Sequence, residues 1–231
     1  MKEIFTMLSR LRCALKGSLP GAESHIRMAP PARVELFNEG NRTPENARKA
    51  AVLIPLYFKE GELYTVFIKR PVYDGVHSGQ IAFPGGKMED CDENFVATAL
   101  REAEEEVGIE REKVLVLGSL SQLYIPPSNF LIEPVVGYVY RRPDFVLQKE
   151  EVQEIVEIPV SRFYPVIEKE FLEIASTHST PFITPCFRIE DITIWGATAM
   201  VIREFLDIVQ SIDSSKVFAT YHSELNNRLL K

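Results

Sequence analysis

The first residues of the chain repeat apolar side chains at the spacing of a helix. In residues 2–16 the apolar positions fall three and four residues apart on one stripe, which predicts an amphipathic packing helix. The stripe consists of Ile4, Phe5, Leu8, Leu11 and Leu15. Residues 29–48, in contrast, hold three prolines and a polar run, which predict an extended surface connection. We therefore expect residues 1–46 to form an N-terminal helix and extended connection packed on a domain that spans residues 47–231.

From residue 50 the pattern becomes that of strands. Residues 50–58 form a compact apolar run and residues 63–70 are rich in β-branched and aromatic side chains, so each run predicts a strand. The intervening residues 59–62, KEGE, predict a hairpin turn. Residues 72–87 contain four glycines and are predicted to be irregular.

Helical spacing returns in residues 93–107 and 197–212, and we expect a further helix in residues 213–231. Strand-like runs lie between these segments. Because strands and helices alternate without a regular βαβ rhythm, the pattern predicts an α/β fold with a mixed sheet and helices on both faces.

Composition and charge exclude several classes of protein. The 231 residues are 45% hydrophobic and 26% charged, which is typical of a folded domain and not of a disordered chain. The net charge of −7 argues against a general nucleic-acid binder. No apolar run approaches the roughly 18 residues of a membrane span. Three widely spaced cysteines argue against a disulfide framework and a structural zinc site, so we expect a cytoplasmic protein.

The predicted helix at residues 93–107 carries an acidic face. With Glu102 as reference, Glu105 lies about 60° to one side and Glu106 about 40° to the other, so three carboxylates share one face. Such a cluster suits a hard cation such as Mg²⁺ or Mn²⁺, although a solvated acidic face is the alternative. Asp90 and Glu93 suggest a capping box at the start of the helix, and Gly108 a C-terminal stop.

The segment before the helix favours the metal-site interpretation. Residues 83–86, FPGG, form a tight turn whose backbone can approach a ligand or metal closely. Lys87 follows this turn, but Met88 stands where a phosphate-cradling P-loop requires Ser or Thr.

Residues 83–109 resemble the Nudix box, Gx(5)Ex(7)REUxEExGU, in which U is a bulky apolar residue. The matching positions are Glu93, Arg101, Glu102, Glu105, Glu106, Gly108 and Ile109. Ala103 replaces the first apolar position, and Gly86 lies one residue further upstream than the pattern places its glycine. The resemblance implies a Nudix-type α/β/α sandwich with a mixed central sheet and a catalytic loop-helix.

The wider chain resembles the coenzyme A pyrophosphatase branch of that family, whose signature is roughly LLTxR[SA]xxxRxxxGxxxFPGG. Arg70, Gly79 and residues 83–86 match in register, whereas Pro71 and Gly75 depart from it. This resemblance implies metal-dependent hydrolysis of the pyrophosphate bond of coenzyme A or its derivatives, giving 3′,5′-ADP and a phosphopantetheine.

The resemblance also implies roles for individual residues. Mg²⁺ or Mn²⁺ would be held by Glu102, Glu105, Glu106 and a carbonyl of Gly86. Arg101 would form an ion pair that fixes Glu93 or a neighbouring glutamate, and Glu105 would act in catalysis. A general base would come from outside the box, with Glu154 preferred over Glu151. The residues expected to bind substrate are Arg70, His77 and Lys87.

Two other functions stay open at this stage. The departures at Pro71 and Gly75 are compatible with another nucleoside diphosphate derivative, such as ADP-ribose or a dinucleotide. A non-catalytic nucleotide sensor is the alternative of another class, and the survival of all three box glutamates argues against it. The expected partner is a small molecule and neither nucleic acid nor membrane, with a homodimer suggested by analogy.

Overall fold

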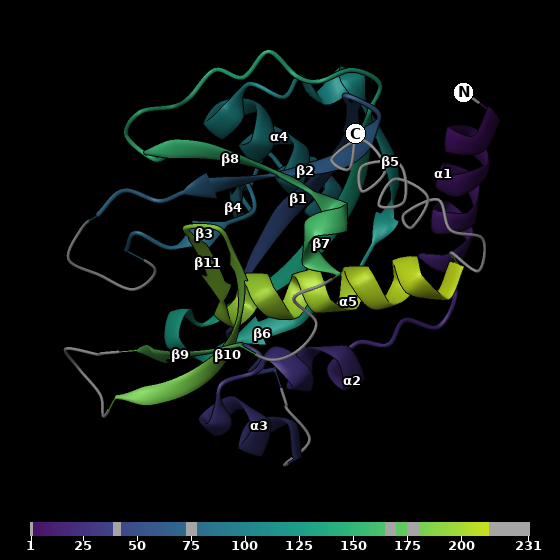
Figure 1. Cartoon of the computed structure of the whole chain (residues 1–231). Coiled ribbons are helices and arrows are strands. Elements are labelled where there is room, and N and C mark those ends of the chain that lie inside the picture. Colours follow the sequence, from purple (N-terminus) through teal and green to yellow (C-terminus); the bar gives the residue numbers. More distant parts are fainter. Residues whose placement is uncertain (1, 39–42, 73–77, 165–169, 175–180, 213–231) are drawn as a thin grey trace.

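The computed structural model describes residues 2–38, 43–72, 78–164, 170–174 and 181–212 (Figure 1). The expected helix in residues 213–231 therefore lies outside the described residues.

A mixed sheet of eight strands forms the centre of the described structure. β1 (Arg48–Lys59) and β2 (Glu62–Lys69) form the predicted hairpin, and its turn residues Glu60 and Gly61 adopt left-handed φ values of 53° and 85°. β1 also pairs in parallel with β7 (Phe130–Val139), whereas the other pairings in this sheet are antiparallel. The remaining strands are β3 (Ile81–Ala82), β4 (Gly85–Lys87), β5 (Val114–Ser119), β6 (Leu123–Ile125) and β8 (Glu154–Pro159). In its described part, residue 72 and residues 78–87, the segment predicted to be irregular contributes two short strands, β3 and β4.

Helices cover both faces of this sheet, which confirms the predicted α/β/α arrangement (Figure 1). Alternate residues of β1 point to opposite faces, as in any strand. Leu53 packs with buried residues of α4 (Phe95–Val107), while Ile54 packs with those of α1 (Lys2–Ala14) and α5 (Gly196–Ile212).

The N-terminal helix forms as predicted, but its buried face is rotated relative to the predicted apolar stripe. Leu8, Leu11 and Leu15 are buried together with Met7, whereas Phe5 is 58% exposed. Phe5 lies about 100° around the helix from the centre of this stripe, so the prediction that it packs inward is wrong.

The extended connection predicted for residues 29–48 is wrong for its first part, which forms α3 (Pro31–Asn38). The short helices α2 (Ala22–His25) and η1 (Ile26–Met28) precede it. Proline is favoured in the first turn of a helix because its missing N–H has no partner there, and Pro31 begins α3 in this way. The carbonyl of Pro30 accepts hydrogen bonds from the backbone N–H groups of Arg33 and Val34.

A buried polar network holds this N-terminal segment on α5. The fully buried carboxylate of Glu204 accepts hydrogen bonds from His25 Nε2 at 2.8 Å, Ser121 Oγ at 2.6 Å and the backbone N–H of Gly21 at 3.1 Å. Burial raises the pKa of Glu204, but the bonds from His25 and Ser121 more than offset this and leave the pKa lowered. The network fixes the start of the chain against the domain and so positions α3.

A second sheet lies beside the N-terminal end of α5. It consists of β9 (Glu170–Ile174), β10 (Phe182–Ile189) and β11 (Ile192–Trp195), in the order β11-β10-β9. Among the described helices, none combines the length and the apolarity needed to cross a bilayer.

Candidate active site

The helix α4 carries the acidic residues and has well-defined ends. Its N-cap is Asn94, whose side chain accepts a hydrogen bond from the backbone N–H of Ala97 at 3.0 Å. Gly108 ends the helix in the left-handed conformation, as predicted. The expected capping box of Asp90 and Glu93 is wrong, because the preceding loop continues to Asn94 before the helix begins.

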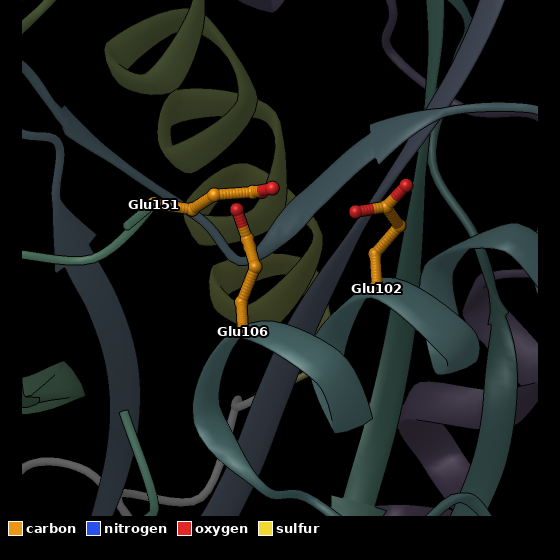
Figure 2. Close-up of side chains that lie close together, drawn as sticks. All are labelled: Glu102, Glu106 and Glu151. Carbon is orange, nitrogen blue, oxygen red and sulfur yellow. The ribbon is translucent and has the colours of Figure 1, made fainter. Parts of the chain in front are cut away.

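Three carboxylates converge at one place on the molecule. Oxygen atoms of Glu102, Glu106 and Glu151 all lie within 4.8 Å of one another (Figure 2). Glu102 and Glu106 come from successive turns of α4, and Glu151 comes from the turn that precedes β8. The i, i+4 spacing on the helix therefore supplies two members of the cluster, and the fold supplies the third.

Backbone hydrogen bonds place Glu151 at the helix. The N–H of Val146 donates to the carbonyl of Val107, and the N–H of Gln148 donates to that of Glu106. The N–H of Glu151 in turn donates to the carbonyl of Gln148 at 3.1 Å. The loop before β8 is thus tied to the last turn of α4, where the carbonyls have no partner within the helix.

Burial makes the charges of this cluster costly. Glu106 is only 2% exposed, and burial is the main reason that its pKa is raised to about 8. A backbone hydrogen bond from Gly85 and the charge of Arg70 lower this pKa, whereas the other two carboxylates raise it. Burial also raises the pKa of Glu102. Three crowded carboxylates, of which Glu102 and Glu106 are desolvated and Glu151 is exposed, fit a hard divalent cation such as Mg²⁺ or Mn²⁺.

The two glycines of the predicted turn pack directly on these carboxylates. The N–H of Gly85 donates to Glu106 Oε2 at 2.8 Å. A Cβ at Gly85 would lie 2.3 Å from the carbonyl oxygen of Ala51, so no larger residue fits there. A Cβ at Gly86 would lie 2.5 Å from the carboxylate of Glu102. Gly85 is therefore required by the close approach of β4 to β1, and Gly86 leaves room for the carboxylate of Glu102.

Substitution of Gly86 by alanine tests this packing. We expect Gly86→Ala to lower kcat by about 100-fold, because the new methyl group displaces the Glu102 carboxylate. The melting temperature should change little, since the displaced group is the end of a flexible side chain. A variant that keeps wild-type turnover would show that the position of Glu102 is unimportant. Steady-state kinetics and thermal unfolding provide the two readouts.

Arg101 ties the glycine-rich turn, the loop before α4 and the acidic face together. It donates to both carboxylate oxygens of Asp92, at 3.0 and 2.8 Å, and to the backbone carbonyl of Lys87 at 3.0 Å. It also lies 3.0 Å from Glu102 and 2.9 Å from Glu105. The neighbouring-glutamate part of the prediction is confirmed, but the acid in the preceding loop is Asp92 and not Glu93, which is exposed.

The Asp92–Arg101 pair makes a pH-dependent contribution to stability. Hydrogen bonds from Arg101 are the main reason that the pKa of Asp92 falls from its ordinary 3.8 to about 2. The ionised carboxylate therefore stabilises the fold above about pH 4, and this contribution is lost as the pH falls toward 2. We expect Asp92→Asn to lower the free energy of unfolding by about 2 kcal/mol at pH 7. Urea unfolding should show the difference from wild type shrinking as the pH falls from 5 to 2; a constant difference over this range would contradict the assignment.

The other residues that the sequence predicts for the site lie at different distances from the three-carboxylate cluster. Glu105 is 54% exposed and pairs with Arg101, so it borders the three-carboxylate cluster. Glu154, the preferred base, is 56% exposed and lies 3.8 Å from Lys69. The structure therefore brings Glu151, and not Glu154, to the cluster. His77 lies outside the described residues.

A cleft of about 2170 Å³ extends from the acidic cluster across the sheet. Arg70 and Lys87 line it near the cluster, together with Gly85 and Gly86. The side chain of Lys87 is exposed. The N-terminal α3 and the strand β11 line other parts of the same cleft. The volume is sufficient for a large, extended substrate.

Known proteins are similar to this chain in sequence and in fold. A family model described as the NUDIX domain matches residues 47–178. A protein described as the uncharacterized Nudix hydrolase NudL from Photorhabdus laumondii is 34% identical over 188 residues, covering 80% of this chain and 93% of the relative. NudL of Yersinia pestis is 37% identical over 156 residues, covering 68% and 77% of the two chains. The crystal structure of the Nudix hydrolase RenU from M. smegmatis superposes with a TM-score of 0.51 at 15% identity, over 72% of this chain and 88% of that one.

Proposed function

This chain belongs to the Nudix hydrolase family, whose members act on pyrophosphate bonds of nucleoside diphosphate derivatives, and we propose that its substrate is coenzyme A or one of its derivatives. Water would add to one phosphorus atom of the diphosphate while the bridging P–O bond breaks. The products would be 3′,5′-ADP and a phosphopantetheine.

One observation carries this proposal: the residues that match the coenzyme A pyrophosphatase signature line the same cleft as the acidic cluster. Arg70, Gly79, Phe83 and the glycine pair all contribute to its wall. Their common position supports a role in binding the substrate beside the carboxylates.

A divalent cation is part of the proposed chemistry. Glu102, Glu106 and Glu151 would hold Mg²⁺ or Mn²⁺, with Glu105 and the carbonyl of Gly86 as further ligands. When bound, such a cation neutralises phosphate charge and lowers the pKa of a coordinated water.

The residues of the chain itself would orient the substrate and the ligands. The guanidinium of Arg70 lines the cleft close enough to Glu106 to lower the pKa of that carboxyl, and it would hold an anionic phosphate there. Arg101 fixes the position of Glu102, and the N–H of Gly85 fixes that of Glu106. The exposed carboxylate of Glu105 would accept a proton at the rim of the cluster. Lys87 would contact the diphosphate from the cleft wall.

A second substrate class shares the same chemistry. Pro71 and Gly75 depart from the coenzyme A signature, and Gly75 removes a cation that is expected to meet an anionic substrate group. ADP-ribose or a dinucleotide is therefore the alternative.

A substrate panel decides between these proposals. Coenzyme A, acetyl-coenzyme A, ADP-ribose, NADH and diadenosine polyphosphates would be incubated with Mg²⁺ or Mn²⁺ and the products separated by chromatography. We expect the highest kcat/KM for coenzyme A, with release of 3′,5′-ADP. A preference for ADP-ribose or a dinucleotide would overturn the proposed substrate and leave the family assignment intact.

A further inference from the structure

Arg33 is a buried cation at the part of the cleft formed by α3. Its side chain lines the cleft and yet the residue is only 7% exposed. One nitrogen, Nη2, donates to the backbone carbonyl of Tyr124 in β6. The guanidinium also lies 5.0 Å from the ring centre of Phe37 and 6.0 Å from that of Tyr124, so two aromatic rings flank it.

The remaining donors of Arg33 are unsatisfied. Nε and Nη1 are both buried and have no hydrogen-bond partner among the described residues. None of the ion pairs in the described part of the chain includes this side chain either. A buried, unpaired guanidinium is expensive, and burial accordingly lowers its pKa. Its planar set of donors suits the oxygens of a phosphate.

The position of Arg33 is far from the acidic cluster but within the same cleft. At this end of the sheet β4, β1, β7 and β6 are successive neighbours. Three strand spacings of ~4.8 Å place β6 about 14 Å from the glycine pair in β4. A group that meets Arg33 is therefore remote from the diphosphate at the carboxylates.

The fold holds Arg33 in place before any ligand binds. α3 follows directly on the segment that His25 and Gly21 anchor to the buried Glu204. Arg33 itself bridges α3 to β6. The other cleft residues that α3 contributes are uncharged, so the cation stands in an otherwise apolar wall. Such a preorganised charge loses little freedom when it binds an anion.

We propose that Arg33 binds a phosphomonoester on the nucleoside half of the substrate, remote from the diphosphate that is cleaved. This inference rests on the proposed function and deepens it: in coenzyme A the group is the 3′-phosphate of the ADP moiety. The subsite makes the enzyme prefer substrates that carry this additional phosphate.

The test compares coenzyme A with coenzyme A that lacks its 3′-phosphate, using wild type, Arg33→Gln and Arg33→Lys. We expect Arg33→Gln to lower kcat/KM for coenzyme A by about 10-fold to 100-fold, mainly by raising KM. For the substrate without the 3′-phosphate, kcat/KM should stay within about twofold of the wild-type value. Arg33→Lys keeps the charge and should recover part of the loss. Arg12→Gln removes the same charge from the exposed face of α1 and should leave kcat/KM unchanged for both substrates. Equal losses on both substrates, or no loss, would overturn the subsite.

A binding measurement separates failure of the subsite from failure of the proposed substrate. Calorimetry without metal would compare adenosine 3′,5′-bisphosphate with AMP on folded wild type and Arg33→Gln, after their thermal unfolding has been compared. Wild type should bind the bisphosphate about 10-fold tighter or more, and Arg33→Gln should bind both equally. A wild-type protein without this preference, or a variant that retains it, would contradict the role of Arg33. If coenzyme A is not hydrolysed at all, the proposed substrate fails, and this measurement alone decides the subsite.

Discussion

Replacing Glu106 by glutamine should lower kcat for diphosphate hydrolysis by about 1,000-fold or more while the fold persists. Glu106 is the most buried member of the three-carboxylate cluster, at 2% exposure, and Gly85 fixes one of its oxygens. Loss of a metal ligand removes several kcal/mol of charge stabilisation in the transition state, and about 1.4 kcal/mol corresponds to a tenfold rate. Steady-state kinetics at saturating Mg²⁺ or Mn²⁺ provide the measurement.

Two controls make the Glu106 result interpretable. Glutamine is nearly isosteric, its amide oxygen can accept the hydrogen bond from Gly85, and it removes the cost of ionising a buried carboxyl whose pKa is raised to about 8. The metal-free variant should therefore be at least as stable as wild type in thermal unfolding. Glu104 lies on the same helix but pairs with Arg111, and Glu104→Gln should keep turnover within about twofold. If Glu106→Gln kept wild-type turnover, the three-carboxylate cluster would have no role in catalysis.

Replacing Glu151 by glutamine should lower kcat by about 100-fold or more and raise the metal concentration needed for half-maximal activity. Glu151 brings its carboxylate to Glu102 and Glu106 from outside α4, although it is exposed. Loss of one of three carboxylates weakens a site for a hard cation because both charge and ligand number fall.

Glu154→Gln is the matched control, because this acid lies three residues away and pairs with Lys69. We expect it to retain turnover within about twofold. If Glu154→Gln were the more damaging of the two changes, the preference based on the sequence would be right and the geometric assignment wrong. Kinetics and metal titrations of both variants decide between them.

Local patterns in the sequence were sufficient to predict the half of the site that one helix carries. The 3.6-residue period places Glu102 and Glu106 on one face, and the glycine pair signals a close approach of backbone. The hairpin at residues 59–62 and the stop at Gly108 were likewise encoded by their own residues. The α/β/α layers follow from alternating apolar runs and amphipathic helices.

Features that depend on contacts distant in sequence could not be predicted in this way. Glu151 reaches the cluster because the N–H of Gln148 bonds to the carbonyl of Glu106, a pairing that leaves no pattern in either segment. Arg101 pairs with Asp92 and not with Glu93 because the loop before α4 buries the side chain of Asp92 beside Arg101 and leaves that of Glu93 exposed. The proposed role of Arg33 leaves no local pattern, because α3 lacks a regular apolar stripe and the guanidinium is held by the carbonyl of Tyr124, which is distant in sequence.

The most direct test of the account is the position of Mn²⁺ in a crystal of the wild-type protein, located by its anomalous scattering. We predict a peak at coordination distance from oxygens of Glu102, Glu106 and Glu151, beside the glycine pair of β4. A peak elsewhere, or one whose ligands exclude Glu106 and Glu151, would contradict the assignment of these three carboxylates as the centre of the active site.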